Sequence, residues 1–154
     1  MTSRMSDPAS GRGWDPMPDP ALRILLVEDD AVAASGLEVF VLECGHEIVG
    51  TAATVPAALR AAAASRPNLA LVDVRLGEGG DGIEFAREIW KRSAVPSILI
   101  TGFADGETLR RARAAHPLDV LTKPVLPHRL RWSLTGAAAL LRAGWRPAHM
   151  MAKR

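Results

Sequence analysis

The sequence lacks several features that would place it in other classes of protein. Its 154 residues include a single cysteine, Cys44, so no disulfide can form within the chain, and we interpret Cys44 as a buried thiol in a reducing compartment. No apolar run approaches the roughly 18 residues of a membrane-spanning helix. Residues 1–20 lack the hydrophobic segment of a secretory signal. These absences predict a cytoplasmic protein that does not enter a membrane.

Charge of one sign is not in large excess either. The formal net charge is +2, and the one basic cluster, Arg110, Arg111 and Arg113, is typical of a solvent-facing helix surface rather than a nucleic-acid reader. Hydrophobic residues make up 48% and charged residues 23% of the chain, which is the balance of a folded globular protein. We therefore predict no direct nucleic-acid binding.

The composition divides the chain into three parts. Residues 1–20 are rich in Pro, Gly, Ser and Asp, which predicts a disordered leader. Residues 21–143 are long enough for one compact domain with its own core. Residues 144–154 form a short tail, too short to be a second, output domain.

Short apolar runs alternate with longer helical patterns throughout the predicted domain. The runs predict strands at 22–27, 47–52, 69–72, 97–100 and 119–122, and helices at 31–44, 56–64, 82–91, 107–115 and 127–142. Gly45 is placed to end the first helix, and Thr54 to cap the second. Strands that each precede a helix require right-handed crossovers, so the fold class is α/β with a parallel sheet covered on both faces.

Polar residues follow four of the predicted strands. They are Glu28, Asp29 and Asp30 after the first, Asp73 after the third, Thr101 after the fourth and Lys123 after the fifth. Functional groups in open parallel sheets gather beyond the carboxyl ends of the strands. Carboxylates held together there need a cation, and their hard oxygen atoms suit Mg²⁺. A carboxylate can also act as the nucleophile in phosphoryl transfer, with a lysine and a hydroxyl holding the phosphoryl oxygens.

Four segments resemble the signature regions of response-regulator receiver domains of two-component signalling. They are LLVEDD (25–30), LALVDV (69–74), ILITG (98–102) and VLTKP (120–124). The resemblance extends over about residues 21–141. It implies a flavodoxin-like, doubly wound (βα)5 fold with strand order 2-1-3-4-5, in a stand-alone receiver domain.

The resemblance also implies a metal site. Asp73 matches the aspartate that accepts the phosphoryl group and binds Mg²⁺. Asp29 matches the acid that binds Mg²⁺ directly, and Glu28 the acid that acts through a water molecule. The backbone carbonyl of Arg75 would be a further protein ligand.

Two more residues would act on the phosphoryl group. Lys123, followed by Pro124 in what is typically a cis peptide, would neutralise the phosphoryl oxygens. Thr101 would move toward the phosphoryl group and couple it to the face formed by the fourth helix, fifth strand and fifth helix.

The family resemblance further implies the partners. The phosphodonor would be a phosphohistidine on a sensor histidine kinase or a histidine phosphotransfer protein, and the acyl phosphate would later hydrolyse. The domain would catalyse only its own phosphorylation and dephosphorylation. A downstream protein would bind the face just described. Independently of the resemblance, Trp132 lies off the apolar stripe of the last helix and Trp145 beyond that helix, so either is a candidate for a partner or homodimer surface.

The sequence departs from the family pattern in two places. Val120 replaces the usual aromatic residue of the fifth strand, and Phe103 is a hypothetical substitute. The loop after Asp73 is longer than usual, and its glycines predict high mobility.

Several alternatives remain at this point. The chain could be a receiver that has lost switching and serves as a constitutive binding module. A haloacid-dehalogenase-type phosphohydrolase is disfavoured, because Arg75 occupies the position of its second aspartate. We interpret Asp30 and Asp81 as helix N-caps rather than metal ligands, and His46, His116, His128 and His149 as surface residues.

Overall fold

The computed structural model describes residues 20–102 and 105–145. The predicted leader apart from Pro20, the tail from residue 146 on, Phe103 and His149 therefore lie outside the described residues. The elements are β1 (Arg23–Val27), α1 (Ala31–Glu43), β2 (Glu47–Ala52), α2 (Val55–Ser65), β3 (Leu69–Asp73), the 3-10 turn η1 (Gly77–Gly79), α3 (Gly82–Ser93), β4 (Ser97–Thr101), α4 (Gly106–Ala114), β5 (Asp119–Thr122) and α5 (Pro127–Arg142).

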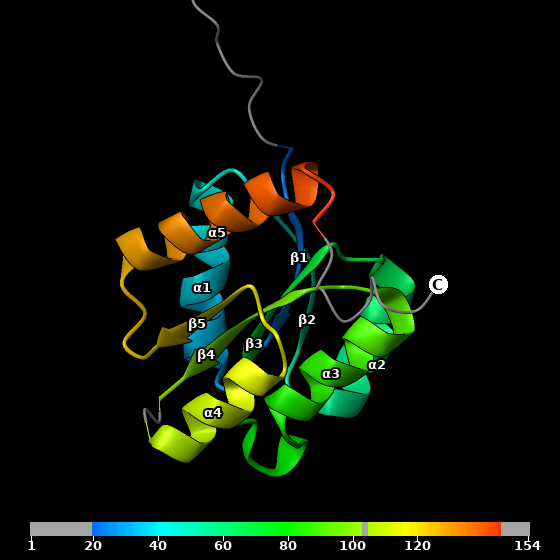
Figure 1. Ribbon diagram of the computed structural model, residues 1–154, viewed down its shortest axis with the longest axis vertical. Coiled ribbons are helices and arrows are strands. Elements are labelled where there is room, and N and C mark those ends of the chain that lie inside the picture. The colour runs from blue at the N-terminus through cyan, green and yellow to red at the C-terminus, as the bar shows by residue number, and fades with distance from the viewer. Residues whose placement is uncertain (1–19, 103–104, 146–154) are drawn as a thin grey trace, which may run out of the picture.

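The strands form one parallel sheet between two layers of helices. The strand order is β2-β1-β3-β4-β5, which confirms the predicted flavodoxin-like topology. Helices α1 and α5 cover one face, and α2, α3 and α4 cover the other (Figure 1). Each face has its own apolar cluster, and Phe85 and Ile83 of α3 lie in one while Leu130 and Leu134 of α5 lie in the other. Within the described residues no helix is long and apolar enough to cross a bilayer.

The most apolar strands occupy the middle of the sheet. Every residue of β3 (LALVD) and of β4 (SILIT) is buried. A strand covered by helices on both faces must be apolar on both faces, so its sequence is a continuous run rather than an alternation. This burial makes Asp73, the last residue of β3, a carboxylate at the end of an apolar strand.

Four of the helices have an N-cap residue whose side chain accepts backbone hydrogen bonds. Asp30 accepts hydrogen bonds from the backbone N–H groups of Val32 and Ala33, and Asp81 accepts one from Ile83. These bonds satisfy amides that have no partner within the helix, and both residues are N-caps as predicted. Thr54 and Asp105 cap α2 and α4 in the same way.

Three sequence interpretations need correction. His46 is not a plain surface residue, because its Nδ1 accepts a hydrogen bond from the Leu22 amide at 3.1 Å. Cys44 is half-buried at the C-terminal end of α1 rather than buried. Arg111 does not simply face solvent, because it pairs with Asp81.

The two tryptophans predicted to mark a surface have different environments. Trp132 of α5 is 74% exposed, as expected for a residue off the apolar stripe. Trp145 instead packs against Trp90 near the end of α3, with ring centroids 6.3 Å apart and planes tilted by 57°. The residues just after α5 therefore contact the helix layer on the opposite face of the sheet.

Candidate functional site

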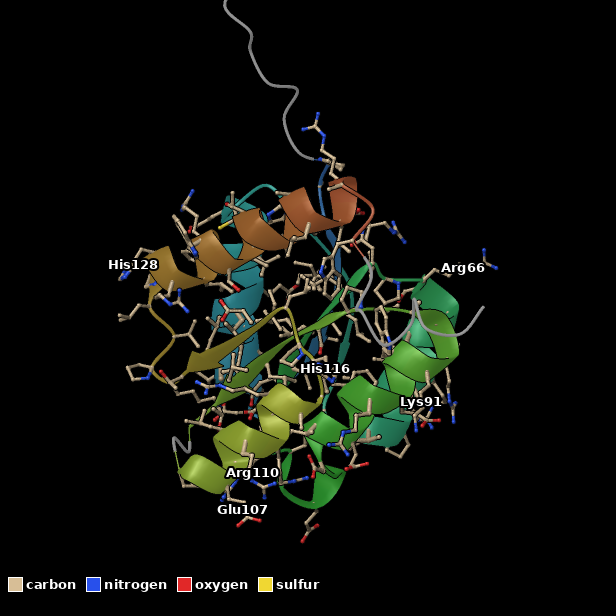
Figure 2. The ribbon with its side chains drawn as sticks, in the orientation of Figure 1. Arg66, Lys91, Glu107, Arg110, His116 and His128 are labelled. Carbon is tan, nitrogen blue, oxygen red and sulfur yellow. The ribbon has the colours of Figure 1, made fainter. Side chains whose placement is uncertain are left out.

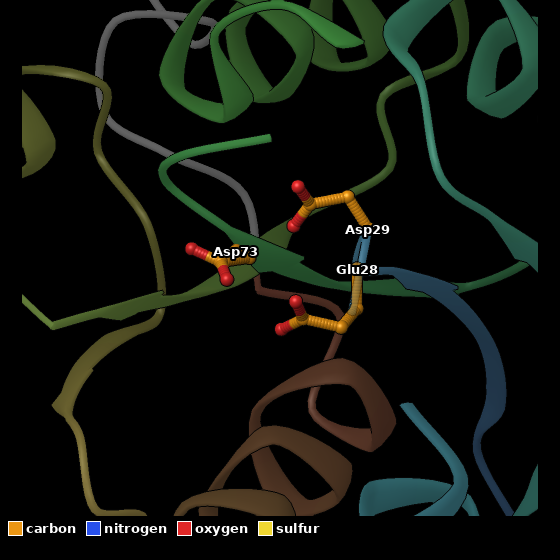
Figure 3. Close-up of side chains that lie close together, drawn as sticks. All are labelled: Glu28, Asp29 and Asp73. Atoms are coloured by element: carbon orange, nitrogen blue, oxygen red, sulfur yellow. The ribbon is translucent and has the colours of Figure 1, made fainter. Parts of the chain in front are cut away.

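Three acidic side chains meet where β1 and β3 end. These strands are neighbours in the sheet, so Glu28 and Asp29, which follow β1, lie beside Asp73. One carboxylate oxygen from each of the three lies within 4.8 Å of the others (Figure 3). Asp73 is 5% exposed and Glu28 is 3% exposed, whereas Asp29 is exposed. The structure thus brings together the acids that the strand ends predicted.

Lys123 reaches the same place from β5, two strands away from β3. Its Nζ lies 2.6 Å from Asp73 Oδ2 and 3.6 Å from Glu28 Oε2. Its backbone N–H donates to the carbonyl of Thr101 at 2.8 Å. This bond fixes the Lys123 backbone relative to β4. The Lys123–Pro124 peptide is cis, as predicted.

Burial makes the acidic cluster electrostatically costly. Burial, and after it the neighbouring Asp73, raise the pKa of Glu28 from 4.5 to about 7. Burial alone would lower the pKa of Lys123, but the carboxylates of Asp73 and Glu28 outweigh it and raise that pKa above 10.5. A single ammonium group therefore faces the two buried carboxyl groups of Glu28 and Asp73 in this pocket.

The donor atoms of this pocket fit a hard divalent cation. Glu28 Oε2 is buried and accepts no hydrogen bond, although a buried carboxylate oxygen normally has a partner. Three carboxylates within 4.8 Å of one another match the oxygen ligands that Mg²⁺ takes from proteins. A cation that supplies positive charge and ordered water would satisfy both features.

The Asp73 carboxylate is held by groups from two directions. The N–H of Arg75 donates to Asp73 Oδ1 at 2.9 Å, and Lys123 donates to Oδ2 at 2.6 Å. Both bonds fix the orientation of the carboxylate. Arg75 is thus adjacent to the acidic cluster through its amide, and the role of its carbonyl as a metal ligand stays a prediction.

Thr101 is buried at the end of β4, next to Asp73 on β3. Asp73 pairs in register with Ile100, so Thr101 lies one residue beyond that pair. Val120 of β5 is half-buried and packs against the apolar cluster under α2, α3 and α4. The predicted switching motion of Thr101 stays a prediction.

The glycines after Asp73 have packing roles that the sequence did not reveal. A Cβ at Gly79 would lie 2.6 Å from the carbonyl oxygen of Ala53, and one at Gly82 would lie 2.0 Å from that of Asp73. Gly77 and Gly80 have φ angles of +56° and +111°, which favour glycine. Close approach and backbone conformation account for these glycines, and the predicted mobility of the loop stays a prediction.

Sequence reasoning also missed a salt bridge beside the site. Arg111 of α4 donates to Asp81 Oδ2 at 2.5 Å, and the two residues are 30 positions apart. The Asp-Gly pair at 81–82 indicated a helix start, but nothing in the sequence paired it with one arginine of α4.

Comparisons with known proteins agree with this geometry. A family model described as the response regulator receiver domain matches residues 24–135. The chain is 32% identical over 126 residues to the phyllosphere-induced regulator PhyR of Methylorubrum extorquens, a match that covers 81% of this chain and 46% of that protein. It is 34% identical over 102 residues to the transcriptional regulatory protein PdtaR of Mycobacterium tuberculosis, covering 66% of this chain and 49% of that protein.

A solved structure gives the same result. The signal receiver domain of a modulated diguanylate cyclase from Desulfovibrio desulfuricans superposes with a TM-score of 0.75 at 32% identity, covering 82% of this chain and 100% of that one. The chain spans about half the length of the two curated relatives. From its strand order, its acidic pocket and these matches, the chain belongs to the response regulator receiver domain family of two-component signalling.

Proposed function

We propose that this receiver domain is a working phosphorylation switch in which Asp73 accepts a phosphoryl group from a phosphohistidine. The observation that carries the proposal is the contact of Lys123 with Asp73 inside a pocket that also contains Glu28 and Asp29. A charged lysine beside an oriented carboxylate provides the charge that a transferring phosphoryl group needs. A module that only binds partners needs no such buried charges.

The transfer is a substitution at phosphorus. An oxygen of the Asp73 carboxylate forms a bond to phosphorus while the bond from phosphorus to the histidine nitrogen of the donor breaks. The electron pair of that bond returns to the imidazole, which then takes up a proton. The product is an acyl phosphate on Asp73, and its hydrolysis returns the carboxylate and inorganic phosphate.

The residues around Asp73 have separate roles in this reaction. Lys123 holds and neutralises phosphoryl oxygens, and the Arg75 amide keeps the carboxylate oriented. Glu28, Asp29, Asp73 and the Arg75 carbonyl would hold Mg²⁺. When bound, magnesium supplies positive charge that offsets the carboxylates and the oxygens of the incoming group.

The phosphorylated domain would act through protein contacts. The named relatives are regulators of larger size, and within residues 20–102 and 105–145 the structure holds one receiver domain. We propose that a sensor histidine kinase or histidine phosphotransfer protein supplies the phosphoryl group. The downstream protein would bind the face made of α4, β5 and α5, with a second copy of the chain as the alternative occupant.

The proposal is tested by chemical phosphorylation. The full chain is incubated with Mg²⁺ and acetyl phosphate, and its intact mass is measured. We expect a gain of one phosphoryl group in the wild type and no gain in Asp73→Asn, which keeps the shape of the side chain. A wild-type protein that gains no mass would overturn the proposal and favour the constitutive binding module.

A further inference from the structure

A salt bridge connects the loop after Asp73 to helix α4. Arg111 and Asp81 are 2.5 Å apart, and their side chains are 40% and 35% exposed. Burial opposes ionisation of Asp81, but hydrogen bonds from Arg111 and the Ile83 amide outweigh it and lower the pKa of Asp81. The contact is therefore a charged pair in a half-buried position, which solvent screens less than one at the surface.

Asp81 is joined by backbone contacts to the residues next to Asp73. It forms an antiparallel bridge with Arg75, and the next amide, that of Gly82, donates to the carbonyl of Val74 at 2.9 Å. The backbones of Gly82 and Asp73 are in close contact, since a Cβ on Gly82 would overlap the Asp73 carbonyl oxygen. A displacement of Asp81 would consequently move the Arg75 backbone.

The positive charge of Arg75 also acts on the residue that caps α4. Asp105 caps α4, and hydrogen bonds from Thr108 followed by the positive charge of Arg75 lower the pKa of Asp105. Asp81 thus pairs with Arg111 of α4, and the charge of Arg75 acts on Asp105, the N-cap of the same helix. Crossed charges of this kind favour one relative placement of loop and helix.

We propose that Asp81 and Arg111 are positioning residues that hold the Arg75 backbone as part of the Mg²⁺ site and make that site dependent on the placement of α4. The inference rests on the proposed function. In this proposal the Asp81–Arg111 salt bridge couples α4 to the loop that follows Asp73. The coupling does not involve Thr101 or Val120. Asp81 and Arg111 themselves need not touch the cation or the phosphoryl group.

The test compares Mg²⁺ affinities, measured by calorimetry without a phosphodonor. Arg111→Met removes the salt bridge, and Arg110→Met is the matched control, because Arg110 is on the same helix with a side chain that is 75% exposed. We expect Arg111→Met to bind Mg²⁺ about threefold to fivefold more weakly, as expected for the loss of one partly screened pair. Arg110→Met should bind as the wild type does.

Asp81→Asn tests the other partner of the salt bridge. Asparagine can still cap α3 but carries no charge. Asp81→Asn and the Arg111→Met/Asp81→Asn double variant should show the same weakening as Arg111→Met, since all three lack one interaction. Hydrogen exchange should also show that Mg²⁺ protects the amides of α4 in the wild type and not in Arg111→Met.

The outcomes separate this inference from the proposed function. If the wild type binds Mg²⁺ and is phosphorylated but Arg111→Met has unchanged Mg²⁺ affinity, the positioning role is wrong and the proposed function stands. A loss of thermal stability in Arg111→Met without a change in affinity has the same meaning. A wild type that neither binds Mg²⁺ nor accepts a phosphoryl group overturns both.

Discussion

Two charged clusters lie close together at the carboxyl edge of the sheet, and they are built in opposite ways. The acidic pocket sets the carboxyl groups of Glu28, Asp29 and Asp73 against the single ammonium of Lys123, and one buried oxygen has no hydrogen-bond partner. The other cluster is a half-exposed salt bridge of equal and opposite charges. The acidic pocket therefore has an excess of negative charge that can bind a cation, whereas the charges of the salt bridge cancel.

The comparison predicts opposite effects on folding. Removing a carboxylate charge from the acidic pocket should stabilise the metal-free protein, because it relieves repulsion between carboxylates and the cost of burying one. Removing a charge from the balanced pair should destabilise it. The surface charges gathered on α4, such as Glu107 and Arg110 in Figure 2, lie away from the body of the domain and should matter less to either quantity.

The largest expected effect is on phosphorylation in Lys123→Met. The variant loses the ammonium group 2.6 Å from Asp73, so we expect its rate of phosphorylation by acetyl phosphate to fall by about a hundredfold. The rate is measured by intact mass over time. Lys91→Met, on the exposed surface of α3, is the control and should react like the wild type. A rate within a factor of about three of the wild type would remove Lys123 from the mechanism.

The next effect is on the stability of Glu28→Gln. The pKa of Glu28 is raised from 4.5 to about 7 in the folded state, so the metal-free wild type should lose stability as the pH rises through that interval. Glutamine does not ionise. We therefore expect Glu28→Gln to be more stable than the wild type by about 1–2 kcal/mol at pH 8, with little difference near pH 4.5.

Urea unfolding in a chelator at both pH values measures this difference. Glu43→Gln, at an exposed position of α1, should show no such pH dependence. A Glu28→Gln protein less stable than the wild type at pH 8 would mean that the carboxylate is a net stabilising group, and the contrast between the two clusters would fail.

The smallest effect is on the stability of Arg111→Met. Breaking a half-exposed pair costs about 0.5–1 kcal/mol, so urea unfolding should show a modest loss near neutral pH. The loss should shrink in high salt, which screens the pair in the wild type. Equal or greater stability of the variant would place this salt bridge with the many surface pairs that contribute nothing to folding.

The acidic pocket could be predicted from sequence because its members follow buried strands. In a parallel sheet the ends of neighbouring strands lie at one edge, so Asp73 after LALV and Lys123 after DVLT had to come together once the strands were recognised. The Arg111–Asp81 pair depends instead on how α4 is rotated against the loop. No periodicity in the sequence specifies that rotation.

Helix α1 shows a second limit of sequence reasoning. Its pattern predicted a helix correctly, but Val32 is 83% exposed and Val39 is 56% exposed. A helix with apolar residues all round has no single stripe to indicate which side meets the sheet. The buried positions, Ala34 and Val41, could only be assigned once α5 and the strands were placed.

The tilted stacking of Trp145 on Trp90 has a practical consequence. Helix α3 begins at the edge of the sheet that carries Asp73 and ends at the opposite edge, where the two indoles meet. A dye attached beside this indole pair would therefore lie at the edge of the sheet opposite Asp73. Emission from the two indoles would report separation of Trp145 from Trp90, and changes near Asp73 could be judged against it.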